Sequence, residues 1–523
     1  MVDRFPVTEA PAASVSVDVF TAAAPPTEAD FAGFDGNVVV FHLAFAAKAP
    51  AAAKSANFDL ARFESFPSKF FTSEAGVRAV AASANFSGKL SEVVEFFSAK
   101  PDGSLAVEAV AGCGRSADFL TSDAYALAKT LAKVASHHRC KHVLLMLGDL
   151  APDLVESVVT GMLNEISVDK RFRKDQDPGY KLEALHVAAS SVLDGADMAR
   201  RCRALAVAMH TTRELVTAPA NYANTVSVAN YVKEKYTALG LTVKVLSEAD
   251  CRALGMGSYL AVGQGSRYPP QFLHATYVGE GHVKTKIAFV GKGIMFDSGG
   301  LNIKSAASEI ELMKFDMGGM STIFGAAEAI AALKPSGVEV HFISATCENM
   351  PGPNAYRPGD VVTASNGKTI EVNNTDAEGR LTLADALVYA EKLQVDYIID
   401  AATLTGGCII ALGYQYGGYF ANDEGLNALF QKALDKSGEL AWRLPLAKQY
   451  APSIESKVAD LTNANAAAKA PTINAALFLK EFVESTKWVH WDIAGTAFDK
   501  ASGRGTGYGV RTLVNLVLGL AGQ

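Results

Sequence analysis

The first 190 residues alternate between short apolar runs and one longer segment in which apolar side chains recur at helical spacing. The short runs predict strands, and the longer segment predicts a helix. The strands are Val15–Phe20, Asn37–Phe45, Ser104–Val110 and His142–Leu147, and the helix is Ser122–Ser136. Strands that alternate with a helix predict an α/β domain over residues 1–190.

Alanine and proline dominate three segments of the same region, Ala10–Ala13, Ala22–Pro26 and Ala47–Ala53. They flank the first predicted strands, and we expect loops there. No catalytic motif is found in residues 1–190, so we expect this N-terminal domain to serve assembly.

A long helix is predicted over residues 191–216, where apolar and charged side chains alternate at helical spacing. No proline or glycine follows Gly195 within this segment, and Pro219 closes it. The helix is expected to link the N-terminal domain to a second domain over residues 217–523.

Residues 217–523 again alternate strands with helices, which predicts a second, larger α/β domain. Its strand candidates are Thr242–Leu246, Ile287–Val290, Val338–Ser344, Tyr397–Ala401 and Val489–Ile493. Its helix candidates are Thr322–Leu333, Leu383–Leu393 and Asn474–Val483. The predicted fold class is α/β, with a smaller N-terminal and a larger C-terminal domain.

Composition narrows the class of protein. The chain has 523 residues, of which 49% are apolar and 20% charged, as is typical of globular proteins. Its 55 acidic and 48 basic residues give a net charge of −7, which disfavours nucleic-acid binding through bulk positive charge. The six cysteines are widely spaced and form no CxxC pair, which favours a reducing compartment.

No targeting or membrane-spanning segment is recognised. The N-terminus lacks the basic and apolar regions of a secretory signal. The best apolar run, Val38–Ala47, is shorter than a membrane span and contains His42. The last residues, Ala521-Gly522-Gln523, match no retention or peroxisomal signal. We therefore expect a cytoplasmic protein without a membrane partner.

Several common signatures are missing. The chain has no GxSxG, no HExxH and no Walker loop. Gly263-x-Gly265 lacks the third glycine of a dinucleotide-binding loop, and no phosphate-binding lysine follows the glycines from Gly503 to Gly509, where we predict a loop.

Four potential metal ligands also lie close together near residue 140: His137, His138, Cys140 and His142. Arg139 and Lys141 lie among them and would repel a metal ion. The end of a helix is predicted here, and cations are favourable at that position. We therefore favour a structural interpretation over a metal site.

Polar residues follow the apolar strand Ile287–Val290 in a glycine-rich segment that reaches Lys304. Glycines permit an irregular backbone there, and open α/β sheets bind ligands at the carboxyl ends of their strands. Lys292, Asp297 and Lys304 of this segment are therefore candidate site residues.

A second group of candidates, Asp376, Glu378 and Arg380, lies near the start of a predicted helix, and Asp316 lies between the two groups. Three aspartates, one glutamate and a lysine nitrogen could hold two divalent metals, because two-metal sites require bridging carboxylates. In the alternative interpretation these acids cap helices or pair with nearby basic side chains.

Eight segments of the chain resemble the leucine aminopeptidases, the two-metal M17 family of cytosolic aminopeptidases. The most specific is NTDAEGRL at Asn374–Leu381. The others are VGKGIMFDSGG at Val290–Gly300, MKFDMGG at Met313–Gly319, CENMPG at Cys347–Gly352, YRPGDV at Tyr356–Val361, ATLTG at Ala402–Gly406, WVHWDIAG at Trp488–Gly495 and GYGVRTL at Gly507–Leu513. The resemblance is dense over residues 205–523, whereas residues 1–190 resemble the family only in size and α/β character.

The resemblance implies a metallopeptidase catalytic domain over residues 217–523, with a mixed central sheet flanked by helices. It also implies the metal ligands. Asp297 and Glu378 would bridge the two ions, Asp376 would complete one site, and Lys292 and Asp316 would complete the other. The resemblance points to zinc, with manganese, cobalt or magnesium exchangeable at one site. Residue types alone favour manganese or magnesium, because most of the ligands are oxygens.

The remaining roles follow from the same resemblance. Lys304 would be the catalytic lysine beside the substrate carbonyl, and Arg380 would hold the bicarbonate that serves as general base. The pocket for the first side chain would be lined by Met313, Thr403, Leu404 and Gly406.

The resemblance implies release of leucine or similar apolar residues from peptides with a free N-terminus, by a homohexamer. Two alternatives remain. Some family members also bind DNA, a role that the acidic net charge of this chain disfavours. A catalytically inactive structural relative is disfavoured because all five metal ligands, Lys304 and Arg380 are present.

Overall fold

The computed structural model describes residues 5–21, 38–46, 58–60, 84, 86–99, 105–166, 169–174 and 180–522. The chain forms two compact units. The N-terminal unit comprises Thr8–Val207 and Asp435–Gly438, and the C-terminal unit comprises Met1–Val7, Ala208–Leu434 and Glu439–Gln523. The change from one unit to the other falls within helix α6 (Gly195–Thr217).

Helix α6 lies in the segment where a linking helix is predicted, but it begins four residues later than predicted. The Asp194 carboxylate accepts the backbone N–H of Asp197 over 2.9 Å, so Asp194 satisfies a free donor of the first turn and sets the start of the helix.

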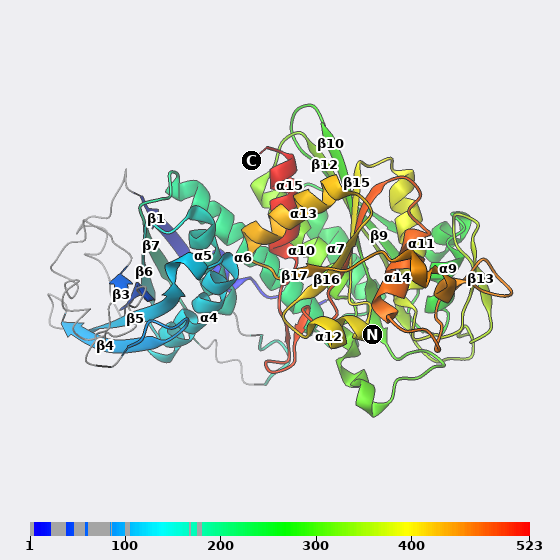
Figure 1. The fold of residues 1–523 in the computed structure, drawn as a ribbon, viewed down its shortest axis with the longest axis horizontal. Coiled ribbons are helices and arrows are strands. Elements are labelled where there is room, and N and C mark those ends of the chain that lie inside the picture. The colour runs from blue at the N-terminus through cyan, green and yellow to red at the C-terminus, as the bar shows by residue number, and fades with distance from the viewer. Residues whose placement is uncertain are drawn as a thin grey trace. The chain divides into compact units, whose positions relative to one another are not determined.

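The N-terminal unit contains a seven-stranded sheet in the order β1-β7-β6-β2-β5-β4, with β3 paired to β2 (Figure 1). The strands are β1 (Ser16–Phe20), β2 (Val38–Ala46), β3 (Phe58–Leu60), β4 (Val93–Ala99), β5 (Leu105–Arg115), β6 (His142–Gly148) and β7 (Ala184–Ala189). The adjacent strands β1, β7, β6, β2 and β5 run parallel. Strand β3 pairs antiparallel with β2, and β4 pairs antiparallel with β5. All four strands predicted in this region are confirmed.

Helices α4 (Thr121–His137) and α5 (Pro152–Glu165) pack together beside this sheet, and η1 (Ser116–Asp118) precedes α4. Buried residues of both helices, among them Leu127 and Val158, share one apolar core with residues of the strands. The predicted helix Ser122–Ser136 is therefore confirmed as α4.

The prediction of a loop at Ala10–Ala13 was wrong, because Pro11–Ser14 forms the one-turn helix α1. Proline suits the first helical turn, and Ala12 is buried in the core of the N-terminal unit. The other two alanine- and proline-rich segments, Ala22–Pro26 and Ala47–Ala53, lie outside the described residues.

A nine-stranded sheet forms the centre of the C-terminal unit, in the order β17-β16-β19-β15-β10-β12-β9-β8, with β11 paired to β12. The strands are β8 (Thr242–Leu246), β9 (Gln271–Val278), β10 (Thr285–Gly291), β11 (Gly293–Asp297), β12 (Val338–Asn349), β15 (Tyr397–Ala402), β16 (Gly417–Ala421), β17 (Ala441–Arg443) and β19 (Lys487–Asp492). Strands β19, β15, β10 and β12 are parallel, whereas β16 and β9 run antiparallel to their central neighbours. The sheet is mixed, as predicted.

Helices cover both faces of this sheet (Figure 1). One face carries α7 (Thr225–Ala238), α10 (Gly318–Leu333) and α15 (Val510–Leu520), and the other carries α9 (Gly257–Gly263), α11 (Gly379–Lys392) and α14 (Pro471–Lys480). The residues Ile287–Val290 of β10 are fully buried, as expected for a parallel strand covered on both sides.

Smaller elements complete the C-terminal unit. They are α8 (Glu248–Ala253), α12 (Gly406–Leu412), α13 (Glu424–Ser437), η2 (Ala306–Ser308), η3 (Ile310–Phe315), η4 (Lys448–Ile454), a sheet of β13 (Val361–Thr363), β14 (Thr369–Glu371) and β18 (Leu461–Thr462), and a hairpin of β20 (Phe498–Asp499) and β21 (Arg504–Gly505). The loop predicted from Gly503 to Gly509 therefore includes a short strand that pairs with β20.

The three helices predicted in the C-terminal unit all exist, but each starts three or four residues earlier than predicted. The first turns of these helices contain Gly318, Gly379 and Pro471. Glycine and proline favour the prediction of a loop from sequence alone. Proline is favourable at a first helical position, and tertiary packing overrides the low helix propensity of glycine.

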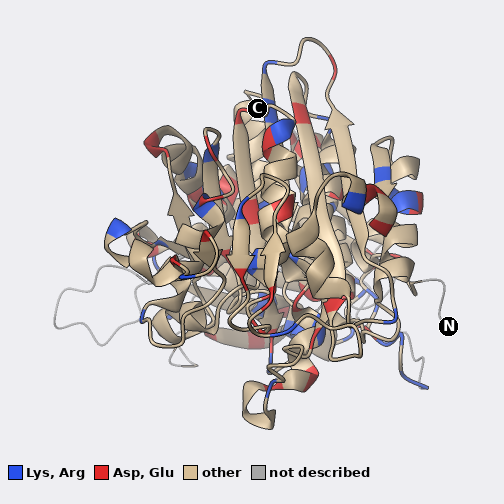
Figure 2. Cartoon of the chain, turned by 90° about the vertical axis from the view of Figure 1, so that its right-hand side faces the viewer, with Lys and Arg blue, Asp and Glu red and all other residues tan. Residues whose placement is uncertain are grey.

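No helix of the described residues is long and apolar enough to cross a membrane. Figure 2 shows acidic and basic positions interspersed over the face that it presents.

Candidate metal and active site

The candidate residues of the first segment lie at the carboxyl ends of the central strands. Lys292 connects β10 to β11, and Asp297 is the last residue of β11. The segment after β10 was predicted as an irregular loop, but Gly293–Asp297 forms a strand because it pairs with the end of β12. The irregular turn comes later, at Gly299, whose φ of 85° favours glycine.

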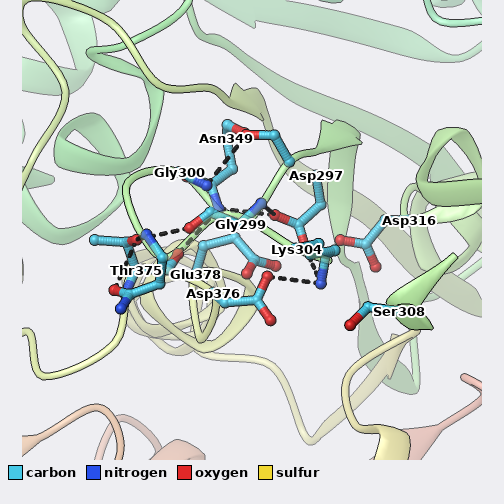
Figure 3. A network of polar contacts seen from close by, with 12 residues as sticks. Asp297, Gly299, Gly300, Lys304, Ser308, Asp316, Asn349, Thr375, Asp376 and Glu378 are labelled. Atoms are coloured by element: carbon cyan, nitrogen blue, oxygen red, sulfur yellow. Dashed lines mark hydrogen bonds and ion pairs between the residues drawn. The ribbon is translucent and has the colours of Figure 1, made fainter. Parts of the chain in front are cut away.

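The other candidate ligands lie at the starts of two helices. Asp376 and Glu378 come directly before α11, and Asp316 follows η3 just before α10. Carboxylate oxygens of Asp297, Asp376 and Glu378 lie within 4.8 Å of one another. Residues that are 79 to 81 positions apart in the sequence thus form one carboxylate cluster, shown in Figure 3.

Lys292 joins the fourth carboxylate to this cluster. Its Nζ lies 2.8 Å from Asp316 Oδ2 and 2.8 Å from Glu378 Oε1, and it donates to the Thr403 carbonyl over 3.0 Å. A Cβ atom at residue 379 would lie 2.4 Å from Lys292 Cε, so only glycine lets α11 approach this lysine so closely.

Lys304 contacts the opposite part of the cluster. Its Nζ lies 2.8 Å from Asp297 Oδ2 and 2.6 Å from Asp376 Oδ1 (Figure 3). Burial opposes the positive charge of Lys304, yet the surrounding carboxylates outweigh burial and raise its pKa above the usual value. Lys304 is therefore an ammonium group at neutral pH in the metal-free cluster.

Acidic groups outnumber basic groups in the cluster, because four carboxyl groups face two ammonium groups. Burial, reinforced by the charge of Glu378, raises the pKa of Asp297 to about 7. Burial likewise raises the pKa values of Asp316 and Asp376. Burial opposes ionisation of Glu378 as well, but Lys292 and Lys304 outweigh it and lower the pKa of that carboxyl.

This arrangement fits divalent cations. Oxygen ligands converge, carboxyl groups outnumber ammonium groups, and Glu378 Oε2 is buried without a hydrogen-bond partner among the described residues. Buried polar atoms in native proteins are normally satisfied, so such an atom indicates a missing ion or ligand.

Arg380 lies in the first turn of α11, next to the cluster. Its Nη1 donates to the Asn463 carbonyl over 2.7 Å, and its Nε is buried without a hydrogen-bond partner among the described residues. A guanidinium with an unsatisfied donor fits an anion such as bicarbonate.

Two of the four predicted pocket residues, Thr403 and Met313, contact Asp316 of the cluster. Thr403 Oγ1 donates to Asp316 Oδ1 over 2.7 Å, and the Met313 carbonyl accepts the backbone N–H of Asp316 over 3.3 Å. Leu404 is half-buried, and the exposed Gly406 begins α12. These contacts connect Thr403 and the backbone of Met313 to Asp316, a candidate metal ligand.

Asn463 was not predicted from the sequence, although its side chain binds the backbone at the start of the NTDAEGRL segment. Its Oδ1 accepts the backbone N–H of Asn373 over 2.9 Å, and its Nδ2 donates to the Asn374 carbonyl over 2.7 Å. No local pattern marks Asn463, because it lies 89 positions beyond the segment that it holds.

The histidines near residue 140 have a different environment. Helix α4 ends at His137, and His138 Nε2 lies 2.5 Å from Glu95 Oε2. Among the described residues, these side chains do not form a cluster of three metal ligands.

Comparisons with known proteins agree on one family. The model of the cytosol aminopeptidase family, catalytic domain, matches residues 210–514. A probable cytosol aminopeptidase of Thermosynechococcus vestitus is 45% identical over 419 residues, covering 78% of this chain and 84% of that protein. One of Synechococcus sp. strain JA-3-3Ab is 48% identical over 397 residues, covering 73% and 78%. A solved variant of tomato leucine aminopeptidase matches with a TM-score of 0.83 at 33% identity, covering 98% of both chains.

Proposed function

The chain belongs to the cytosol aminopeptidase family, and we propose that it releases leucine and similar apolar residues from peptide N-termini with the help of two divalent metal ions. Family membership makes the chain an aminopeptidase, which is a hydrolase. The side-chain preference, the number of metals and the roles of individual residues are our proposal.

The carboxylate cluster is the observation that carries this proposal. Asp297, Asp376 and Glu378 converge within 4.8 Å, and Lys292 connects them to Asp316. We assign all five as metal ligands, with Asp297 and Glu378 shared by both ions. We propose zinc, with manganese, cobalt or magnesium exchangeable at one site.

When bound, the metal ions would supply the Lewis acidity that activates water and would bind the substrate's free N-terminal amine. Lys304 is charged and stands beside the cluster, so its ammonium group can stabilise negative charge that develops on the carbonyl oxygen during hydrolysis. Arg380 would hold bicarbonate through its unsatisfied donor, and bicarbonate would supply a general base.

Met313, Thr403, Leu404 and Gly406 are proposed to line the pocket for the first side chain. Thr403 is tied to the cluster through both Asp316 and Lys292, so the pocket wall and the metal ligands are held in one geometry. Such coupling positions the scissile bond against Lys304.

The purified protein is expected to release the chromophore from a chromogenic leucyl amide, and a chelator is expected to abolish the release. Restoring zinc or manganese should restore activity, and the N-acetylated amide should not be cleaved because it offers no free amine. Chelator-resistant hydrolysis, or equal cleavage of the acetylated amide, would contradict the proposal. A panel of N-terminal residues measures the side-chain preference.

We also propose a homohexamer, as the family resemblance implies. Exposed apolar side chains of the C-terminal unit, including Ile410 at 90% and Trp442 at 62% exposure, are candidates for burial in such an assembly. Light scattering should give a mass near six times the 55.1 kDa of one chain. A fully active, stable monomer would refute this proposal.

A cytoplasmic location is proposed because the relatives are named cytosol aminopeptidases. Peptides with a free N-terminus are the proposed partners. A role for the N-terminal unit in assembly is likewise a proposal.

A further inference from the structure

Asn349, the last residue of β12, is fully buried between the two segments that carry most of the proposed metal ligands. Its Nδ2 donates to Asp297 Oδ1 over 2.8 Å and to the Thr375 carbonyl over 2.9 Å. Thr375 directly precedes Asp376, so a single side chain connects both segments, as Figure 3 shows.

Chemistry determines which way the amide of Asn349 points. Its two neighbours, a carboxylate oxygen and a carbonyl oxygen, are both acceptors, so only the NH2 end of the amide can satisfy them. The Oδ1 atom is then left buried without a hydrogen-bond partner among the described residues. An unsatisfied buried oxygen costs stability.

The backbone of Asn349 is also fixed. Its carbonyl accepts the backbone N–H of Ser298 over 3.0 Å and the Ser298 hydroxyl over 2.7 Å. Asn349 is the register partner of Asp297 in the β11–β12 pair. The amide therefore reaches Asp297 from a rigid position.

The contact makes the two oxygens of Asp297 unequal. Oδ1 accepts from Asn349 Nδ2 and from the backbone N–H of Gly299, the latter over 2.9 Å. Oδ2 instead faces the ammonium group of Lys304 at 2.8 Å. Two donors occupy Oδ1, whereas Lys304 is the one donor at Oδ2 among the described residues, so Oδ2 is the oxygen with room for a metal ion.

We propose that Asn349 is a positioning residue of the metal site. It holds the Asp297 carboxylate so that Oδ2 is presented to the metal ions, and it holds the backbone before Asp376 at the matching distance. This inference rests on the proposed function, because it requires that the cluster binds metal.

The test uses Asn349→Asp, which keeps the size of the side chain but replaces the donor with an acceptor, and Asn349→Ala, which avoids the added charge. Zinc affinity is measured by competition with a chromogenic chelator, and thermal unfolding of the metal-free protein reports folding. Zinc should bind about 10- to 100-fold more weakly in both variants. This is the typical loss of metal affinity when a group that orients a metal ligand is removed. The value of kcat should fall while KM changes little.

Asn224→Ala is the matched control. Asn224 is a buried asparagine of the same unit, but its side chain caps α7 by accepting from Val226 and Ser227. The control should unfold at a lower temperature and bind zinc as the wild type does. Wild-type zinc affinity in either folded Asn349 variant, or an equal loss in the control, overturns the inference. Absence of zinc binding by the wild type would instead refute the proposed function.

Discussion

Replacing Lys304 with alanine is expected to lower kcat by about 10²–10³-fold and to change KM little. The ammonium group lies 2.8 Å from Asp297 Oδ2 and 2.6 Å from Asp376 Oδ1, beside the part of the carboxylate cluster opposite Lys292. Negative charge develops on the substrate carbonyl only as the peptide bond is attacked, so Lys304 stabilises the transition state more than the bound substrate.

Kinetics on a leucyl amide, together with metal analysis, test this prediction. The Lys304→Ala variant should retain two metals per chain, because Lys304 is not assigned as a ligand. Lys286→Ala is the control, since Lys286 lies on β10 before the site and its Nζ is 3.6 Å from Glu339 Oε1. Wild-type kcat in the Lys304 variant would rule out its catalytic role.

Replacing Lys292 with alanine is expected to leave one tightly bound metal per chain in place of two, and to lower activity by at least about 10²-fold. The Nζ of Lys292 contacts Asp316 and Glu378, and it is the only nitrogen in the proposed ligand set. The site around Asp376 has carboxylates only and should keep its metal.

The two sites should also differ in their response to pH. Burial opposes the charge of Lys292, yet Asp316, Glu378 and Asp297 outweigh burial and raise the pKa of its ammonium group. The proton is therefore present at neutral pH without metal, and a metal must displace it to use the nitrogen lone pair. Affinity at this site should fall by at least about tenfold for each unit of decrease in pH, since the ammonium proton of Lys292 is released as the ion binds.

Metal titrations at several pH values, followed by elemental analysis, measure this difference. The Lys292 site should be the weaker and more exchangeable one, and activity should rise toward alkaline pH and respond to added manganese or cobalt. Asp297 and Glu378 are proposed to serve both sites, so the titration of these two carboxyl groups does not distinguish one site from the other. Two tightly held metals in Lys292→Ala, with the pH profile of the wild type, would show that Lys292 only forms ion pairs.

The strands and helices that frame the site could be predicted from the sequence, because their signals are local. The apolar run Ile287–Val290 predicted a buried strand, which is part of β10. The helical spacing of apolar residues after Leu381 predicted a helix, which is part of α11. The candidate residues were also identified in the sequence, since each lies in a short motif next to one of these elements. Strand β11 was missed because it exists only through its pairing with the distant end of β12.

Tertiary structure alone decided how the charged groups are paired. Sequence order does not indicate that Lys292 contacts Asp316 and Glu378 while Lys304 contacts Asp297 and Asp376. These pairings arise because parallel strands end at one edge of the sheet and two helices begin there.

The groups that orient the site were equally hidden from the sequence. Asn349 contacts Asp297 across 52 positions of the chain, and Asn463 contacts Asn374 across 89. The local sequence determined which residues could bind metal or act in catalysis, because residue type and periodicity are local properties. Only the folded sheet determined which oxygen of Asp297 accepts from Asn349 and Gly299, because the pairing of β11 with the distant end of β12 brings Asn349 beside Asp297.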